Sequence, residues 1–308
     1  SDPYGPYASA SSSSSQYKSS NFSVFGNLDY LLSASLKFSI GLRWEDWEAD
    51  YSDSLDELFN PADKMSGGKI SLIKSMTNGT NIYASLAKGY KQGGFNLGLG
   101  LDANSTNQNL AYDPEFLTNY ELGINTKLLD SKINFNGVIF YSYREDQQVL
   151  ISSQTDPSDP NTFSFLTQNA AEGVNHGLEI NMDIDIRESL SAFLNLGMLK
   201  TEIKNWQSRQ DLEGRAQAHA PEKSYALGLN WAPTSDTYLA IDFTGKSSFY
   251  YSDSHNNKSK SYVLTNLNLG YVKNNWSYEL WARNIFDEYY SVRGFYFGNE
   301  APKFIDTL

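Results

Sequence analysis

Cysteine is absent from this 308-residue sequence, which excludes disulfide bonds and thiolate-bound metal ions. The sequence also lacks an apolar run of about 18 residues, the length that a transmembrane helix needs. Clusters of Lys and Arg are missing too, and the net charge is −12, so a nucleic-acid partner is excluded. Residues 1–20 are polar and Ser-rich, without the apolar core of a signal peptide.

Aromatic residues and glycine are plentiful by contrast. Aromatics make up 14% of the chain, with 21 Tyr, and 22 Gly accompany only 9 Pro. This composition favours many β-strands joined by turns. The mean hydropathy of −0.49 is low. It is still compatible with a membrane protein built from strands, because only every second residue of such a strand must be apolar.

Apolar and polar residues alternate with a period of two along most of the chain, as in strands with two different faces. In residues 177–186, Leu178, Ile180 and Met182 share one side, and polar or acidic residues occupy the positions between them. We expect twelve strands of this kind, many of them about ten residues long, enough to cross an outer membrane. They are residues 22–32, 36–45, 69–76, 81–91, 119–128, 132–144, 177–186, 190–200, 224–231, 238–246, 262–271 and 276–283.

The connections between these strands alternate between short and long. The long ones are residues 46–68, 92–116, 145–173, 201–223 and 247–261. Outer-membrane barrels have short turns on the periplasmic side and long loops outside. The pattern therefore predicts an all-β fold, a transmembrane antiparallel up-and-down β-barrel.

Lys88 breaks the alternation, because it shares the apolar side with Leu86 in its strand. Two explanations are open at this point. The side chain extends to the lipid headgroups, or a bulge near Gly89 turns it to the other face.

Several short motifs occur in a fixed order. They are YKQGGFN at 90–96, YDPE at 112–115, NYELG at 119–123, NHGLE at 175–179, APEKS at 220–224 and ARNIFDEYY at 282–290. As an ordered set they resemble the β-barrel of TonB-dependent outer-membrane receptors of the siderophore and iron-complex type. The resemblance covers residues 22–297.

This resemblance implies a fold, a location and a function. The family's barrel has 22 strands, of which about twelve are expected here, without the plug domain and the final strand. Residues 1–21 are then a Ser-rich extracellular loop segment, and residues 22–308 a partial barrel domain in the bacterial outer membrane. The implied function is import of a ferric siderophore or another iron complex, energised by the TonB complex through a missing N-terminal part. Outer-membrane lipid is a further partner, and no cofactor or enzymatic activity is expected.

Two sets of side chains are candidates for function under this interpretation. Ligand contacts are expected near the outer mouth, from aromatic, amide and basic residues: Tyr90, Lys91, Phe95, Asn96, Tyr112, Arg144, Gln147 and Tyr250. Contacts with the plug are expected from charged residues on the polar faces of the strands: Glu121, Glu179, Asp183, Asp185, Glu279 and Arg283.

Metal and catalytic chemistry find little support in the sequence. The three histidines, His176, His219 and His255, are far apart, and no pair has a metal-binding spacing. No Ser-His-Asp or Cys-His set is present.

Other functions remain open. The alternatives are a passive porin-like or adhesin-like barrel, a barrel enzyme of the protease or phospholipase kind, and a soluble β-sandwich that binds glycans. For a transporter, cobalamin, haem or an oligosaccharide are alternative cargoes.

Overall fold

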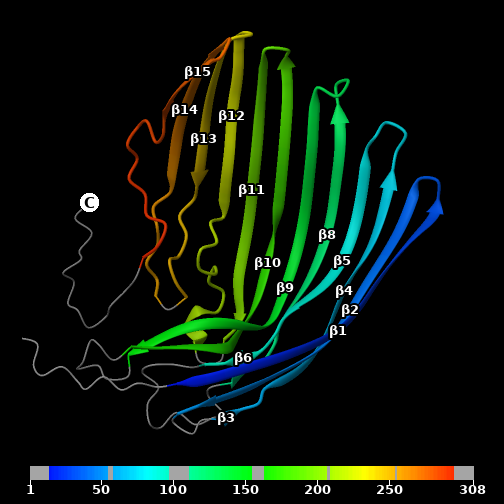
Figure 1. Ribbon diagram of the computed structural model, residues 1–308, viewed down its shortest axis with the longest axis vertical. Coiled ribbons are helices and arrows are strands. Elements are labelled where there is room, and N and C mark those ends of the chain that lie inside the picture. The colour runs from blue at the N-terminus through cyan, green and yellow to red at the C-terminus, as the bar shows by residue number, and fades with distance from the viewer. Residues whose placement is uncertain are drawn as a thin grey trace, which may run out of the picture.

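The computed structural model describes residues 14–54, 58–96, 111–154, 163–206, 209–253 and 255–294. Most of them form one curved antiparallel sheet, in which twelve strands follow one another in chain order (Figure 1). The short strand β3 pairs with β2, and β6 pairs with β7 apart from the main sheet. Among the described residues, no helix is long and apolar enough to cross a membrane. The strands are β1 (Ser15–Ser33), β2 (Leu36–Asp53), β3 (Leu58–Phe59), β4 (Ala62–Ser75), β5 (Asn81–Lys91), β6 (Gly94–Phe95), β7 (Ala111–Tyr112), β8 (Glu115–Leu128), β9 (Ile133–Gln154), β10 (Phe163–Arg187), β11 (Leu190–Asn205), β12 (Lys223–Thr234), β13 (Thr237–Lys246), β14 (Tyr262–Lys273) and β15 (Trp276–Ala282).

All short connections lie at one end of the sheet, the upper end in Figure 1, and the long ones lie at the other. The short turns use left-handed backbone conformations, for example at Gly79 (φ 83°), Asp130 (φ 54°) and Asn274 (φ 53°). Such residues allow the chain to reverse within a few positions. The predicted all-β fold, the twelve strands of the main sheet and the alternation of short and long connections are confirmed.

One face of the sheet, called the apolar face below, carries the alternating apolar residues. Leu178 and Ile180 of β10 lie opposite Met198 and Leu196 of β11. Ile139 lies opposite Leu178 on the other side, and its side chain is 52% exposed. These residues cover the sheet without being enclosed in a core, as strands in contact with lipid require.

The opposite face, called the polar face, is held by side-chain hydrogen bonds between neighbouring strands. Asn266 donates to Asp242 over 2.7 Å, and Asn268 donates to Glu279 over 2.7 Å. Such cross-strand pairs satisfy polar groups where two strands meet. The alternation in the sequence thus produces a wall with two chemically different faces.

The sheet is an open arc within the described residues, because β1 and β15 each pair on one side only. An unpaired strand edge in hydrocarbon leaves backbone groups without partners, each at a cost of several kcal/mol. Two such edges are stable in a membrane only when further strands complete the wall.

The strands extend further toward the long loops than the sequence predicted. Residues 145–173 were expected to be a loop, which is wrong, because β9 continues to Gln154 and β10 begins at Phe163. The hairpin turns sideways at the lower end of Figure 1, near Asp146 (φ 53°) and two register shifts between Asn169 and Gly173. Its mostly polar sequence lacks the regular apolar alternation of the other strands, but backbone pairing sustains the two strands, and Val149 and Ala171 are buried in an apolar cluster at their base.

The first two strands are longer as well. β1 begins at Ser15, where the sequence predicted a strand only from residue 22, and it pairs with β2 as far as Asp53. The expected loops 46–68 and 201–223 are correspondingly shorter, because β2, β4 and β11 occupy their ends. Serine-rich segments have low strand propensity, and here the paired neighbour overrides it.

Lys88 stays on the apolar face. The pairing of β5 with β8 runs without a register shift from Asn81 to Lys91, so no bulge turns the side chain over. Its ammonium group instead lies 4.9 Å from the ring centroid of Phe116, at cation–π distance. Of the two explanations, an outward side chain near the membrane border is the one that the geometry supports.

Candidate functional site

The end of the sheet with the long connections, called the loop end below, contains the residues that the sequence predicted for ligand contact. Phe95 of β6 belongs to an aromatic cluster there. Its ring centroid lies 5.2 Å from Tyr51, 5.5 Å from Phe59 and 5.9 Å from Tyr17. Tyr51 and Phe59 are buried. Phe95 therefore anchors the start of the β5–β8 connection to β2 and β3.

Tyr90 is held by a polar network that joins β2 and β5. Its hydroxyl group donates to Glu45 over 2.8 Å and accepts from the Arg43 Nε over 3.0 Å. Arg43 also forms an ion pair of 2.6 Å with Glu45, whose side chain is buried. Lys91, the next residue, is exposed and lies opposite Glu115 in the register.

Two asparagines bind the backbone of distant segments through both ends of their amides. Asn96 donates to the Thr167 carbonyl over 2.8 Å and accepts from the Thr167 amide over 2.6 Å. Asn169 binds Asp113 in the same way, over 2.8 and 2.6 Å, and also donates to the Asp146 carbonyl over 2.9 Å. Each side-chain amide donates to one backbone carbonyl and accepts from the amide of the same residue, as a paired strand would. Together the two side chains hold the β5–β8 connection against the β9–β10 hairpin.

Arg144, Gln147 and Tyr112 lie around this junction. Arg144 pairs with Glu115 at 3.1 Å. Tyr112 pairs with Gly94 in the two-stranded sheet, where its ring occupies the space that a side chain at Gly94 would need. The side-chain amides of Gln147 and of Gln217, which belongs to the β11–β12 connection, both lie over Gly173.

Replacing Asn169 with alanine tests this junction. The variant loses three neutral hydrogen bonds, so we expect the docking of the β5–β8 connection to weaken by about 2 kcal/mol. Hydrogen exchange of the Asp113 amide should accelerate more than tenfold. Asn181→Ala, on the polar face of the same strand, is the matched control and should leave Asp113 unchanged.

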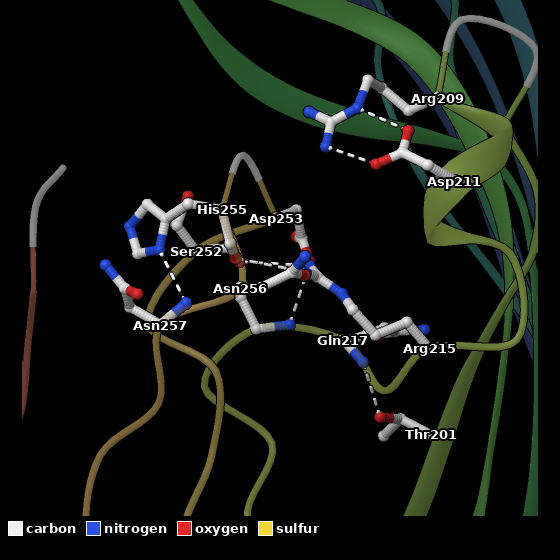
Figure 2. A network of polar contacts seen from close by, with 11 residues as sticks. Thr201, Arg209, Asp211, Arg215, Gln217, Ser252, Asp253, His255, Asn256 and Asn257 are labelled. Atoms are coloured by element: carbon white, nitrogen blue, oxygen red, sulfur yellow. Dashed lines mark hydrogen bonds and ion pairs between the residues drawn. The ribbon is translucent and has the colours of Figure 1, made fainter. Parts of the chain in front are cut away.

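Arg215 joins the β11–β12 and β13–β14 connections (Figure 2). Its guanidinium group donates to the carbonyls of His255 (2.9 Å) and Ser252 (3.1 Å), and to the side chains of Asn256 (2.8 Å) and Asp253 (3.2 Å). The Arg215 side chain is only 9% exposed. Partly buried hydrogen bonds with a charged donor are among the stronger ones in proteins.

The backbone continues this connection. The Asp253 carboxylate accepts from the Ala218 amide over 3.0 Å, and the His219 amide donates to the Tyr250 carbonyl over 2.8 Å. Behind the β11–β12 connection lies a buried apolar cluster of Val149, Ala171, Ile203, Trp206 and Leu212. The hydrogen bonds from Arg215 and from the Ala218 and His219 amides join the two connections into one structural unit.

Tyr250, a predicted ligand contact, sits between two cations. The Arg215 guanidinium carbon is 4.4 Å from the centre of its ring, and the Lys258 ammonium nitrogen is 4.2 Å away. Both distances lie within the range of cation–π contacts. The ring is thereby fixed in orientation, with two positive charges beside it.

His255 closes the same unit in its neutral form. Its Nδ1 accepts a hydrogen bond from the Asn257 amide over 3.2 Å, which a proton on Nδ1 would break. Burial lowers the pKa of His255, the positive charge of Arg215 lowers it further, and a hydrogen bond with the Gly294 backbone acts in the opposite direction. Asp253 is the acidic neighbour of Arg215 in this unit.

This arrangement predicts a pH dependence of loop docking. Because the pKa of His255 is lowered on docking, the undocked loop binds a proton more readily. The free energy of docking is therefore fully present above the ordinary histidine pKa of 6.5 and decreases as the pH falls through the lowered value. Hydrogen exchange of the Tyr251 amide between about pH 7.5 and about pH 5, corrected for intrinsic rates, measures it. His255→Gln should remove the pH dependence, and its persistence in that variant would contradict this explanation.

The charged residues expected to face a plug lie on the polar face. Glu121 accepts hydrogen bonds from Asn119 (2.8 Å) and Ser85 (3.5 Å), and Glu279 accepts one from Asn268. Glu279 and Arg283 line a hollow of about 750 Å³ with Asp242. Three further acids, on β10, follow the same face: Glu179, Asp183 and Asp185.

The structure thus groups the predicted ligand contacts into two neighbouring assemblies. One surrounds the β5–β8 connection, and the other contains Tyr250. Arg215, Asp253 and Asn169 were not predicted from the sequence, and their partners lie 23 to 56 residues away in the chain. No local motif marks such pairs. Within the described segments, no group of three His, Cys, Asp or Glu side chains is arranged to hold a metal ion.

Comparison with known proteins relates this architecture to one family. A sequence model described as "TonB dependent receptor-like, beta-barrel" matches residues 1–285. The probable TonB-dependent siderophore receptor PiuA of Acinetobacter baumannii is 28% identical over 160 residues, which cover 50% of this chain and 20% of PiuA.

Solved structures share the fold. The ferric yersiniabactin uptake receptor FyuA from Yersinia pestis has a TM-score of 0.74 at 18% identity, over 92% of this chain and 43% of FyuA. The siderophore receptor PiuA from Acinetobacter baumannii has a TM-score of 0.73 at 18% identity, over 91% of this chain and 40% of PiuA. This chain therefore spans less than half the length of either protein.

Proposed function

The chain belongs to the β-barrel family of TonB-dependent receptors, and from this we propose that it is part of a receptor that imports a ferric siderophore or a similar iron complex. Members of this family are transporters rather than enzymes, and they reside in the outer membrane of Gram-negative bacteria. In our proposal the whole receptor binds the chelate at the loop end and receives energy for import through TonB.

The observation that carries the choice of ligand is the environment of Tyr250. A flat aromatic ring with the exposed ammonium group of Lys258 beside it suits a chelate that combines negative charge with planar groups, while Arg215, paired with Asp253, holds the ring in place. The similarity to PiuA, a probable siderophore receptor, and to FyuA, a ferric yersiniabactin uptake receptor, supports an iron cargo.

We assign different roles to the residues at the loop end. Exposed or partly exposed side chains contact the ligand: Lys91, Tyr112 and Tyr250. The others position the connections that carry them, through the internal bonds and packing described above: Tyr90, Phe95, Asn96, Arg144 and Gln147.

The charged residues of the polar face are proposed to contact the plug domain of the whole receptor. A surface of alternating acids, amides and a few bases can hold a polar domain by hydrogen bonds and still release it. The residues are Glu121, Glu179, Asp183, Asp185, Glu279 and Arg283.

Growth under iron limitation tests the cargo. A strain that lacks the gene is supplied in turn with ferric siderophores, haem, cobalamin and an oligosaccharide, and a plasmid with the full-length gene is the control. The proposal expects loss of growth on at least one ferric siderophore and its restoration by the plasmid. A defect confined to haem, cobalamin or the oligosaccharide would refute the iron-chelate assignment.

A further inference from the structure

Several basic residues lie on the apolar face near the loop end, on a chain whose net charge is −12. His176 and Lys200 lie directly opposite each other on β10 and β11. Lys223 of β12 lies opposite Met198, two residues from Lys200 on the same face. Lys200 and Lys223 are therefore diagonal neighbours, about 7 to 8 Å apart along the backbone. Lys88 adds a further cation on this face.

Aromatic rings continue this group along the same row. Tyr141 lies opposite His176, with ring centroids 6.3 Å apart and nearly parallel planes, and Tyr120 lies opposite Tyr141 at 6.4 Å. We call Tyr120, Tyr141, His176, Lys200 and Lys223 the outer basic patch. All five side chains are exposed.

The outer basic patch lies at a chemical border. Toward the short turns, the next residues on this face are apolar, for example Leu178 beside His176 and Met198 beside Lys200. Tyrosine rings and lysine ammonium groups at such a border are typical of the headgroup level of a membrane. The patch thus belongs to the level of the outer leaflet's headgroups.

Neighbouring carboxylates already have partners. Glu202, on the same face, forms an ion pair of 2.6 Å with Lys204 and acts on Lys200 and His176 only through a weaker electrostatic attraction, and Glu172 accepts from the Tyr143 hydroxyl over 2.6 Å. Neither Lys200 nor Lys223 forms an ion pair with any residue in the described part of the chain. Two adjacent ammonium groups at a hydrocarbon border call for an anion from outside the protein.

We propose that the outer basic patch binds the phosphate group of an outer-leaflet lipid headgroup. Lys200 and Lys223 contact the phosphate, the imidazole of His176 supplies a further hydrogen bond, and the tyrosine rings pack against the adjoining sugar or glycerol. The acyl chains then lie along the apolar residues below. This site is separate from the proposed ligand-binding end and does not depend on its cargo.

Native mass spectrometry of the full-length receptor tests this proposal, with lipid A, phosphatidylcholine and inorganic phosphate as probes. We expect binding of lipid A, and a loss of affinity of about fivefold for each lysine removed in Lys200→Gln and Lys223→Gln, so about twentyfold or more in the double variant. Lys246→Gln, at the loop end of neighbouring β13 on the polar face, is the matched control and should change the affinity less than twofold.

A second pair of variants separates binding from folding. Lys200→Arg with Lys223→Arg keeps both charges and should bind lipid A like the native receptor. The proposal is overturned if the glutamine pair binds normally, if the arginine pair fails to bind, or if phosphatidylcholine binds as well as lipid A. Displacement of lipid A by millimolar inorganic phosphate would indicate a site for soluble anions and would also overturn it.

Discussion

Replacing Ile180 with arginine is expected to destabilise the full-length receptor in a bilayer by about 3 kcal/mol. Ile180 lies in the middle of β10 on the apolar face, opposite Leu196. An arginine there must leave its guanidinium group in hydrocarbon or distort the membrane around it. Urea unfolding of the receptor from lipid vesicles measures this effect.

Asn181→Arg is the matched control, because it places the same side chain one residue further on the polar face. We expect it to change the free energy of unfolding by less than about 1 kcal/mol, since the polar face, with the carboxylates of Glu179 and Asp183 beside it, accepts the charge. Equal effects of the two substitutions would contradict the assignment of the faces. A larger effect at Asn181 would reverse it.

Arg215→Gln is the second substitution with a large expected effect. It removes a charged group, 9% exposed, that binds four residues of the β13–β14 connection, and it leaves Asp253 without its cation. Removing one partner of a buried ion pair costs about 3 kcal/mol. The two connections should separate, and exchange of the Ala218 and His219 amides, which donate to Asp253 and Tyr250 of the other connection, should accelerate about a hundredfold.

Arg209→Gln is the control for this variant. Arg209 belongs to the same connection and forms an ion pair with Asp211 at 2.9 Å, but the carboxylate is 60% exposed. Exposed ion pairs contribute little to stability, so the exchange of both amides should stay close to native. We also expect Arg215→Gln, and not Arg209→Gln, to weaken chelate binding, because Arg215 contacts the Tyr250 ring and Arg209 has its ion pair with Asp211 instead. Unchanged exchange in Arg215→Gln would contradict the description of the two connections as one unit.

The two-faced sheet could be predicted from the sequence because one face contacts lipid and the other contacts water. Apolar and polar residues must therefore alternate along each strand. The residues of β10 from 177 to 186 alternate strictly, and those of the other predicted strands follow the same pattern, some of them less strictly. Where both sides of a strand meet water, the rule no longer applies. The polar ends of β9 and β10 beyond Arg144 and Gly173 were therefore predicted as loop.

The loop end could be predicted only in part. Loop residues rich in Tyr, Asn and Gln indicate an adaptable surface, but they do not reveal which side chains face a ligand and which bind the protein itself. Asn96 was predicted to contact a ligand, and in the structure its side chain binds backbone of a distant segment, as that of Asn169 does. Arg215 contacts residues 37 to 41 positions later, which no local pattern indicates.

We propose that this barrel belongs to an energised importer rather than a passive channel. The most direct measurement is the accumulation of radiolabelled iron, supplied as the chelate identified by growth, in cells with and without TonB. We expect accumulation only in cells that have both the receptor and TonB, with surface binding retained when TonB is missing. Equal accumulation without TonB would contradict it and would identify the protein as a passive pore.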